Sequence, residues 1–281
     1  MTRRHKLLAL SAGLLFVPLP HLGMLVAPRC PAPPEIDVRI CVEREALPPG
    51  GVAHLGSLNG SLWPPGKMLR VKFLEGGPLA RRYTLAAMKA WERHANVRFV
   101  ASADDDAEVR VRFRAGQGSW AYIGRGALQV PLNQHTMNLG WLNERSDPSE
   151  FYVATHEAGH VLGFVHGQNL PNAAIPWDEA KVYAFFAGPP NYWDRATILS
   201  NVLHKFAPSE VQAGPFDRDS IMQYPVDAKL TTNGFSIGWN RVISPGDSAF
   251  ARRAYPFPSD AGSGVKCPDP RSFLVPEGVN L

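Results

Sequence analysis

Several short segments of the chain alternate hydrophobic with polar residues, and one longer segment spaces its apolar residues as a helix does. Alternation is typical of β-strands, because successive side chains point to opposite faces. It predicts strands at Met68–Leu74 and Val109–Phe113. Ser119–Gly124 alternates aromatic with small residues and is expected to form an edge strand. Helical spacing predicts a helix over Thr84–His94.

Glycine and proline divide the second half of the chain into further elements. Trp177–Ala187 and Tyr192–Lys205 are predicted helices, and the Gly-Pro-Pro sequence at 188–190 separates them. A last helix is expected at Ser244–Ala254, which starts with a good N-cap followed by proline. Strands that precede most of the helices favour an α+β fold.

The sequence from 156 to 166 is His-Glu-Ala-Gly-His-Val-Leu-Gly-Phe-Val-His, which fits the pattern H-E-x-x-H-x-x-G-x-x-H. On a helix, His156 and His160 share one face and can bind one metal ion. Gly163 is expected to end the helix and to turn the chain so that His166 supplies a third ligand. Three protein ligands leave a fourth position for water, as in catalytic zinc sites. Glu157 would accept a proton from that water.

A methionine-containing turn is expected downstream at Asp219–Pro225. Met222 would form the apolar floor beneath the three imidazoles, a position that suits an unbranched, polarizable side chain. Tyr224 follows two positions later. This M-x-Y arrangement is similar to the Met-turn of astacins and serralysins, in which the tyrosine reaches the zinc. The resemblance implies that the Tyr224 phenol hydrogen-bonds the oxyanion during the reaction.

The chain over roughly residues 61–257 resembles an astacin, a family of metzincin zinc proteases. Besides the motifs above, Gly118–Gly124 resembles the astacin edge strand with Ser119 at the usual cysteine, and the sequence from His166 to Pro171 resembles the end of the astacin zinc motif. The resemblance implies one Zn²⁺ ion and a zinc-dependent endopeptidase. It also implies two lobes, with a twisted mixed sheet and the zinc-site helix in the upper lobe, and the Met-turn and C-terminal helix in the lower lobe.

Gly167 departs from the family pattern. Astacins have a glutamate after the third histidine, and it binds the amino terminus that propeptide cleavage frees. With glycine at this position, activity is expected not to require a unique N-terminal residue. Asp178 and Glu179 are the first candidates if another acidic residue has taken over.

The predicted edge strand has a second implied role. In metzincins this edge runs along the cleft, and an extended peptide adds to it as another strand. The candidate substrate-binding residues are therefore Ser119, Trp120, Ala121 and Tyr122. The alternative is that the two aromatic side chains are packed in the core and that only the backbone serves the substrate.

Charge gives no case for a nucleic-acid or anionic-membrane partner. The formal charge of the 281 residues is +4, and three of these charges, Arg3, Arg4 and Lys6, lie in the first 27 residues, which hold no acidic residue. Only +1 is left for the remainder. A polypeptide substrate, a monomeric state and no stable membrane association are expected.

The first 27 residues are typical of an export signal, which predicts a secreted or periplasmic protein. A basic segment, Thr2–Lys6, precedes an apolar segment, Leu7–Val17, that is too short to span a bilayer. The alternative is an uncleaved anchor over residues 7–27. Residues 28–60 are rich in proline and glycine and are expected to be an extension or short prosegment, and residues 258–281 a tail.

The three cysteines, Cys30, Cys41 and Cys267, are predicted to lie outside the catalytic core. Export permits disulfides, and one bridge could join Cys41 to Cys267, although the sequence does not fix the pair. Asp104–Asp106 are expected in a solvated turn, because the ligand spacing of a calcium loop is absent.

Two alternatives to an astacin-like protease stay open. One is another metzincin branch, nearer to serralysins or matrix metalloproteases, although the glycine-rich calcium repeats of full serralysins are absent. The other is a zinc-containing peptide-binding protein that has lost catalysis. The retention of Glu157 and all three histidines argues against it.

Overall fold

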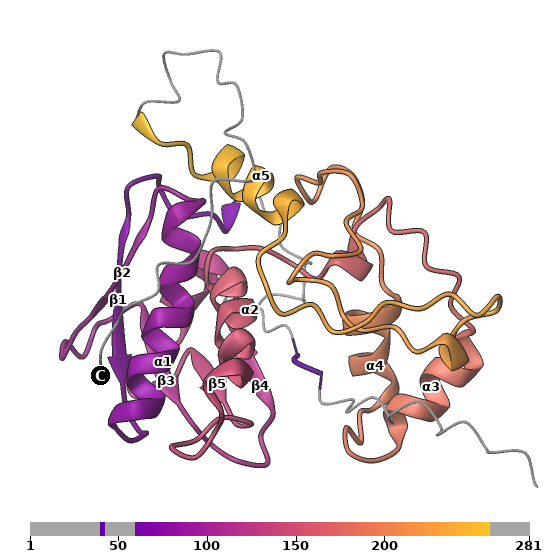
Figure 1. Cartoon of the computed structure of the whole chain (residues 1–281), viewed down its shortest axis with the longest axis horizontal. Helices are drawn as coiled ribbons and strands as arrows, with labels where there is room; N and C mark the ends of the chain where they lie inside the picture. The colour runs from indigo at the N-terminus through magenta and orange to yellow at the C-terminus, as the bar shows by residue number, and fades with distance from the viewer. Residues whose placement is uncertain (1–39, 43–59, 259–281) are drawn as a thin grey trace, which may run out of the picture. The chain divides into compact units, whose positions relative to one another are not determined.

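The computed structural model describes residues 40–42 and 60–258 (Figure 1). The predicted export signal, most of the predicted prosegment and the tail lie outside these residues. Residues 60–165 are called the upper lobe here, and residues 166–258 the lower lobe. Within the described ranges, no helix combines the length and apolar character needed to cross a bilayer.

The upper lobe contains a five-stranded mixed sheet with the order β2-β1-β3-β5-β4. Four strands run parallel, and β4 pairs antiparallel with β5 at one edge. The strands are β1 (Met68–Phe73), β2 (Arg98–Ala101), β3 (Val109–Arg112), β4 (Ser119–Ala121) and β5 (Met137–Leu139). The fold is therefore α+β, and the predicted strands at β1 and β3 are confirmed.

Two strands were not predicted, and the predicted edge strand is shorter than expected. β2 and β5 have four and three residues, too few for alternation to stand out. The predicted strand at Ser119–Gly124 ends at Ala121, because a 3-10 turn begins at Gly124 (Gly124–Gln129).

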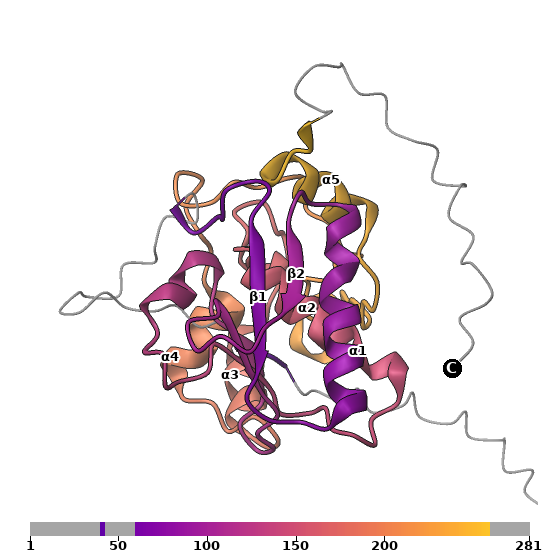
Figure 2. The same cartoon turned by 90° about the vertical axis from the view of Figure 1, so that its left-hand side faces the viewer.

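Helices α1 (Pro78–Lys89) and α2 (Tyr152–Val161) pack against each other on one face of the sheet (Figure 1). Figure 2 shows β1 and β2 in front with α2 behind them. α1 begins six residues before the predicted start at Thr84 and continues into a 3-10 turn (Ala90–Arg93). The Glu144 carboxylate accepts hydrogen bonds from the backbone of Leu79 and Ala80, at 2.9 and 3.1 Å, and so satisfies the first turn.

The main core lies between the sheet and these two helices. Trp91 is fully buried, and its indole nitrogen donates a 2.8 Å hydrogen bond to the Thr155 carbonyl of α2. Other fully buried side chains of this core come from the strands and helices on both sides: Leu69, Val71, Met88, Phe99, Val111, Met137, Leu139, Ala154, Ala158 and Leu162. This packing fixes the position of α2, which carries the zinc motif.

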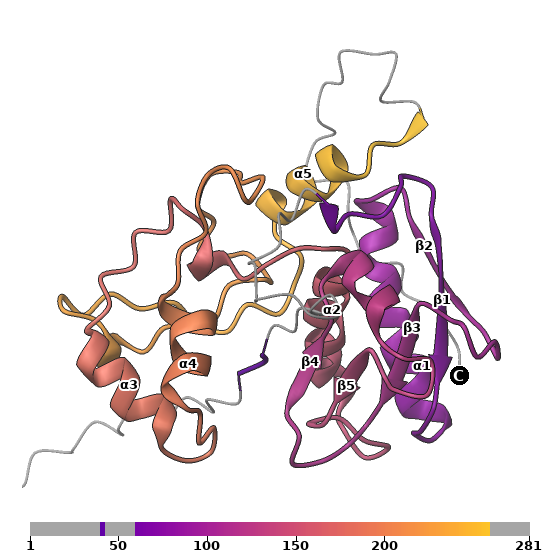
Figure 3. The ribbon, with the colours of Figure 1, turned by 180° about the vertical axis from the view of Figure 1, so that it is seen from behind.

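The lower lobe has short helices joined by long irregular segments. Figure 3 shows α3 (Glu179–Ala187) and α4 (Arg195–Ile198) on the side of α2 away from β1 and β2. α3 begins two residues after the predicted start, at the Asp178 cap. The predicted helix Tyr192–Lys205 is shorter, because α4 begins after the Asp194 cap and passes into a π-helical turn at Leu199–Leu203.

Further short helical turns lie at Pro148–Phe151, Gly167–Asn169 and Ala228–Leu230. The predicted last helix is confirmed as α5 (Pro245–Ala254). The Ser244 and Asp247 side chains form a reciprocal capping box at its start.

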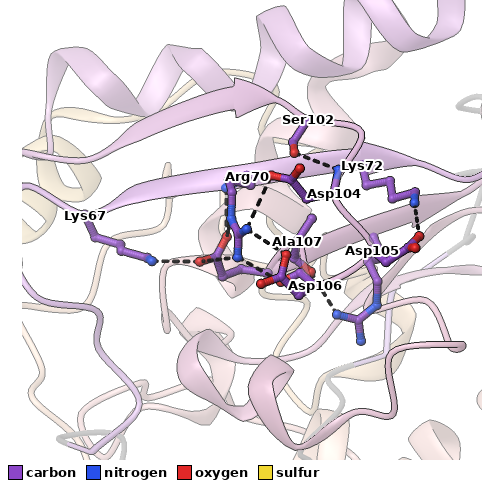
Figure 4. A network of polar contacts seen from close by, with 10 residues as sticks. Lys67, Arg70, Lys72, Ser102, Asp104, Asp105, Asp106 and Ala107 are labelled. Atoms are coloured by element: carbon purple, nitrogen blue, oxygen red, sulfur yellow. Dashed lines mark hydrogen bonds and ion pairs between the residues drawn. The ribbon is translucent and has the colours of Figure 1, made fainter.

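An ion-pair network covers the outer part of β1 (Figure 4). Arg70 contacts Asp106 at 2.7 Å and Glu108 at 3.1 Å, and Lys67 contacts Glu108 at 2.7 Å. Lys72 pairs with Asp105. The aspartates of the turn at 104–106 are therefore partners of basic side chains in an exposed loop.

Candidate active site

The three predicted histidine ligands come together at the end of α2. His156 and His160 lie one helical turn apart, and the chain then reverses at Gly163, whose φ is +93°. The Gly163 amide donates to the His160 carbonyl at 2.8 Å, and the Phe164 amide donates to the Gly159 carbonyl at 3.0 Å. These two bonds form a Schellman motif, which explains why a glycine is needed here and how His166 returns to the site.

The Nε2 atoms of the three imidazoles face one another. His166 Nε2 lies 3.3 Å from His156 Nε2 and 3.1 Å from His160 Nε2. Nitrogen ligands about 2.0 to 2.1 Å from a tetrahedral zinc ion lie about 3.3 to 3.4 Å apart, so the observed spacing is close to that of one zinc site.

Two backbone carbonyls orient these rings. His156 Nδ1 lies 2.6 Å from the Ile221 carbonyl, and His160 Nδ1 lies 2.8 Å from the Phe164 carbonyl. A carbonyl only accepts, so each Nδ1 carries the proton and each Nε2 presents its lone pair to the site. Burial lowers the pKa of His156 to about 3 and the pKa of His166 well below its ordinary value. Both imidazoles are therefore neutral, the form that binds a metal.

Glu157 lies on α2 between the two helical ligands and is fully buried. It lines a small cavity of about 30 Å³ together with His156, Tyr224 and residues 40 and 41. Its neighbours thus include both the ligand set and the tyrosine of the Met-turn.

The turn that carries Met222 packs against α2. Met222 is buried in the main core, and a Cβ atom at Gly159 would come within 2.3 Å of its sulfur. Gly159, the fourth residue of the motif, was not predicted to matter, yet its lack of a side chain lets the turn approach the helix. The Gly167 amide also donates to the Met222 carbonyl at 2.9 Å.

Asp247 of α5 holds the Met-turn in position. Its carboxylate accepts bonds from the Ser220 hydroxyl at 2.6 Å and from the Ile221 amide at 2.8 Å. The Ile221 carbonyl is the partner of His156, so α5 is linked to His156 through one turn. Burial raises the pKa of Asp247, although these hydrogen bonds oppose that shift. From the sequence, Asp247 was predicted only to lie in the first turn of the helix Ser244–Ala254.

Tyr224 is buried beside the third ligand, with ring centroids 4.2 Å from His166. Its hydroxyl donates to the backbone carbonyl of Cys41. Gln168 supports this segment from behind, because its Oε1 accepts from the Tyr224 amide at 3.2 Å and its Nε2 donates to the Asn201 carbonyl at 2.9 Å. From the sequence, Gln168 had no predicted role of its own; it was only one residue of the motif from His166 to Pro171.

Cys41 lies at the ligand set. Its sulfur is 2.9 Å from His156 Nε2, 3.0 Å from His166 Nε2 and 3.7 Å from His160 Nε2. The prediction that Cys41 lies outside the catalytic core is wrong. The suggested bridge between Cys41 and Cys267 stays a prediction, because Cys267 lies outside the residues that the structure describes. Sequence spacing could not reveal this contact, since more than one hundred residues separate Cys41 from the histidines.

The candidate substrate-binding strand lies beside α2, but its side chains are covered. Ser119, Trp120 and Ala121 are all buried, and Trp120 packs against Tyr122 with ring centroids 5.9 Å apart. β4 forms the end of the sheet, where it pairs with β5. The alternative raised from the sequence, packed side chains with a role for the backbone alone, agrees better with this arrangement.

Local packing explains why residue 167 is a glycine. A Cβ atom at this position would lie 2.7 Å from Oε1 of Gln223, which is buried next to it. A glutamate there would collide with the Met-turn unless Gln223 moved. The buried Gln223 side chain therefore requires a residue without a side chain at position 167, where the family has glutamate.

Three imidazoles from a buried helix and a following turn, an adjacent glutamate and a Met-turn below them define a metzincin-type zinc site. Comparisons with known proteins agree. The family model described as Astacin (Peptidase family M12A) matches residues 59–174. Bone morphogenetic protein 1 of Xenopus laevis is 26% identical over 217 residues, which are 70% of this chain and 27% of that protein. Zinc metalloproteinase nas-36 of Haemonchus contortus is 27% identical over 168 residues, 58% of this chain and 24% of that protein.

Solved structures give the same result. Myroilysin is 37% identical with a TM-score of 0.70, and the match covers 72% of this chain and 98% of myroilysin. High choriolytic enzyme 1 from Oryzias latipes, at 18% identity and a TM-score of 0.50, shares the fold over 70% of this chain and 95% of that protein. The chain belongs to the astacin family, peptidase family M12A, whose members use zinc. It spans about a quarter of the length of the two curated relatives named above.

Proposed function

We propose that this chain is a zinc-dependent endopeptidase that hydrolyses peptide bonds in proteins or peptides. The observation that carries the proposal is the convergence of three imidazole Nε2 atoms next to a buried glutamate. Membership of a peptidase family supports it. The ligands are His156, His160 and His166, and their neutral state and oriented rings suit Zn²⁺.

Glu157 is the proposed general base and acid. A zinc ion held by the histidines would polarise the scissile carbonyl and lower the pKa of attacking water to about 7. Glu157 would accept the proton of that water and later deliver it to the leaving amine. Because water is the nucleophile, no covalent bond between the chain and its substrate is needed.

Tyr224 is the proposed donor to the oxyanion. Its hydroxyl already donates to a backbone carbonyl in the cleft, that of Cys41. A substrate carbonyl that takes this place would receive the same hydrogen bond, which becomes stronger as negative charge develops on the oxygen.

An extended peptide is the proposed substrate, bound along β4. This strand is at the edge of the sheet beside α2, and main-chain pairing with a sheet edge accepts many sequences. Because the side chains of Ser119, Trp120 and Ala121 are buried, their proposed contribution is to fix the strand.

Export to the cell exterior or periplasm, a monomeric state and the absence of nucleic-acid or stable membrane partners are part of the same proposal. The basic and apolar segments of the first 27 residues support export. The near-neutral remainder supports the absence of anionic partners.

A quenched-peptide library tests the function. The enzymes are the full chain and its Cys41→Ser variant, which lacks the sulfur that lies next to His156 and His166. Hydrolysis that stops with a chelator and returns with Zn²⁺ is expected, and the cleaved sequences give the preference. Stoichiometric zinc binding without hydrolysis of any peptide or denatured protein would instead favour a peptide-binding protein that has lost catalysis.

A further inference from the structure

The strand at the edge of the sheet, β4, has three residues. It pairs with β5, and residues 122–136 connect the two strands. A hairpin turn between antiparallel strands needs about two to five residues, so this connection is long and does not fix the register of β4 by itself. Contacts from other elements must therefore hold the strand in place.

Arg110 of β3 holds this connection close to its end. Its side chain is 2% exposed, and burial lowers the pKa of Arg110, so the charge is kept in the interior at a cost. The guanidinium donates to four backbone carbonyls, those of Gln134 at 2.6 Å, Ala107 at 2.8 Å, Val130 at 3.0 Å and Pro131 at 3.3 Å. Three of them belong to the connection. A guanidinium suits this task, because it carries five N–H donors in one rigid plane.

The last residues of the connection link Arg110 to β4. The His135 ring packs against Trp120 of β4, with centroids 4.8 Å apart. The Thr136 carbonyl accepts a hydrogen bond from the Tyr122 amide at 3.0 Å, and the Thr136 amide donates to the Arg110 carbonyl at 2.9 Å. The Thr136 hydroxyl accepts from the Arg110 amide at 2.9 Å as well. The carboxyl end of β4 is thus joined to β3, one strand beyond its own partner β5.

Asn138 of β5 holds the segment that leads into β4. The side chain is fully buried. Its Nδ2 donates to the carbonyls of Gly118 at 2.6 Å and Arg114 at 3.2 Å, and its Oδ1 accepts from the Arg114 amide at 2.9 Å. Gly118 directly precedes β4, so one side chain closes the turn from 114 to 118 against β5. Asn138 and Arg110 therefore fix the backbone on either side of the edge strand.

Both side chains lie on the face of the sheet away from α2. Their neighbours in sequence on β3 and β5 belong to the main core, and successive residues of a strand point to opposite faces. Loss of either side chain should therefore disturb β4 while the histidines of the zinc motif keep their packing.

We propose that Arg110 and Asn138 are positioning residues that hold β4 in the extended form with which a substrate peptide pairs. The inference rests on the proposed binding of the peptide along β4. A peptide that adds to a sheet edge needs backbone donors and acceptors that are already in register. Where the strand has to be ordered during binding, the free energy of ordering is subtracted from the affinity.

Steady-state hydrolysis of one peptide by Arg110→Met and Asn138→Leu measures this role, in full-length chains that also carry Cys41→Ser. KM is expected to rise about fivefold to tenfold, with kcat within about twofold, because binding rather than chemistry then includes the ordering of β4. Arg110→Lys keeps three donors and should recover part of the affinity. The matched control is Arg112→Met on the same strand and face, whose side chain pairs with Glu75 at 3.6 Å. Its KM should equal that of the parent chain.

Amide hydrogen exchange tests the positioning without any hydrolysis. The amides of residues 118–136 are expected to exchange at least about tenfold faster in Arg110→Met than in the parent chain, while those of α2 are unchanged. Asn138→Leu should have the same effect on residues 114–121. Binding of a labelled library peptide to the same chains with Glu157→Gln added gives a Kd, which should rise by the same factor as KM.

The outcomes separate this inference from the proposed function. An unchanged KM in both variants, a fall in kcat alone, or an equal rise of KM in Arg112→Met would overturn it, and so would unchanged exchange at β4. If Arg110→Met does not fold, Arg110→Lys and Asn138→Leu decide the matter by the same measurements. Faster exchange at β4 and weaker peptide binding, with no hydrolysis by any chain, would support the positioning role and contradict the proposed peptidase function.

Discussion

The two lobes hold the same site by different means. In the upper lobe, strand ladders and a continuous apolar core position α2, so His156 and His160 depend on many small contributions. In the lower lobe, single polar side chains bind backbone groups of long irregular segments. One substitution in the lower lobe should therefore disturb the site more than one on the exposed face of an upper-lobe element.

Several polar side chains make this kind of contact in the lower lobe. Lys205 donates to the carbonyls of Gln168 and Ala173 at 2.5 and 2.6 Å, and Asn169 donates to the His204 carbonyl at 2.7 Å. Burial lowers the pKa of Lys205 to about 8. Such residues leave a donor or acceptor buried and unpaired when they are replaced, which costs about 1–3 kcal/mol for each group.

The largest effect is expected for Asp247→Ala. The change leaves the Ser220 hydroxyl and the amides of Ile221 and Ser244 without their buried acceptor, and it should reduce the free energy of unfolding by about 3–5 kcal/mol. Zinc affinity should fall as well, because Ile221 orients His156. Denaturant unfolding and metal titration measure the two effects.

The matched control for that change is Asp227→Ala. Asp227 caps a short 3-10 turn of the same lobe through the Lys229 amide, and its loss should cost only about 0.5–1 kcal/mol. Equal losses of stability in the two variants would contradict the special role of Asp247.

Tyr224→Phe is expected to lower kcat by about 10- to 1000-fold in a Cys41→Ser background, because one oxyanion donor is lost. KM should change much less, since the donor acts mainly in the transition state. Steady-state kinetics with one peptide decide the matter. An effect confined to KM would make Tyr224 a binding residue.

Glu108→Gln probes the upper-lobe network and should cost about 1–3 kcal/mol at pH 7. Burial alone would raise the pKa of Glu108, but hydrogen bonds from Lys67 and Arg70 outweigh it and hold the pKa at about 2, against an ordinary 4.5. A depressed folded-state pKa gives stability that is present above pH 4.5 and is lost as the pH falls toward 2.

Unfolding of the wild type and Glu108→Gln at pH 7 and pH 3 tests this sign. The difference in stability between them should shrink at the lower pH. A difference that stays constant between these pH values would show that the charge of Glu108 contributes nothing.

The smallest effect is expected for the choice of N-terminal residue. Chains in a Cys41→Ser background, or chains that start between residues 42 and 61 and remain folded, should differ in kcat/KM by less than about threefold, because Gly167 offers no carboxylate. A sharp maximum at one start site would contradict this.

If such a maximum were found, an acidic residue other than the two proposed from the sequence should be replaced first. Asp178, proposed from the sequence, caps α3 and pairs with Lys181 at 2.7 Å. Asp217 instead lines a cavity of about 570 Å³ that also has Gly167 and Met222 in its walls. Asp217 and Asp219, which both line this cavity, are therefore the first acidic residues to replace.

The cluster of three histidines was predictable because its members are close together in the sequence. His156, His160 and His166 lie within eleven residues, and the helix and the Gly163 turn that join them follow from short-range rules. The two main strands, β1 and β3, were predictable for the same reason. Their boundaries agree within one residue.

The remaining features depend on residues far apart in the sequence. The start of α1 is fixed by Glu144 and the place of the Met-turn by Asp247, and the Cys41 sulfur contacts the histidines across more than one hundred residues. None of these partners has a sequence pattern of its own. The two short strands β2 and β5 gain their ladders only from tertiary pairing.

Glu157→Gln in a Cys41→Ser background tests whether Glu157 is the general base, through zinc content and turnover measured on the same preparation. One zinc per chain, unchanged unfolding and a turnover lower by about 10²- to 10⁴-fold are expected, because the neutral amide cannot accept the proton. Glu157→Asp keeps a carboxylate and should retain more activity than the amide. Near-normal turnover of Glu157→Gln with zinc fully bound would contradict the proposed mechanism.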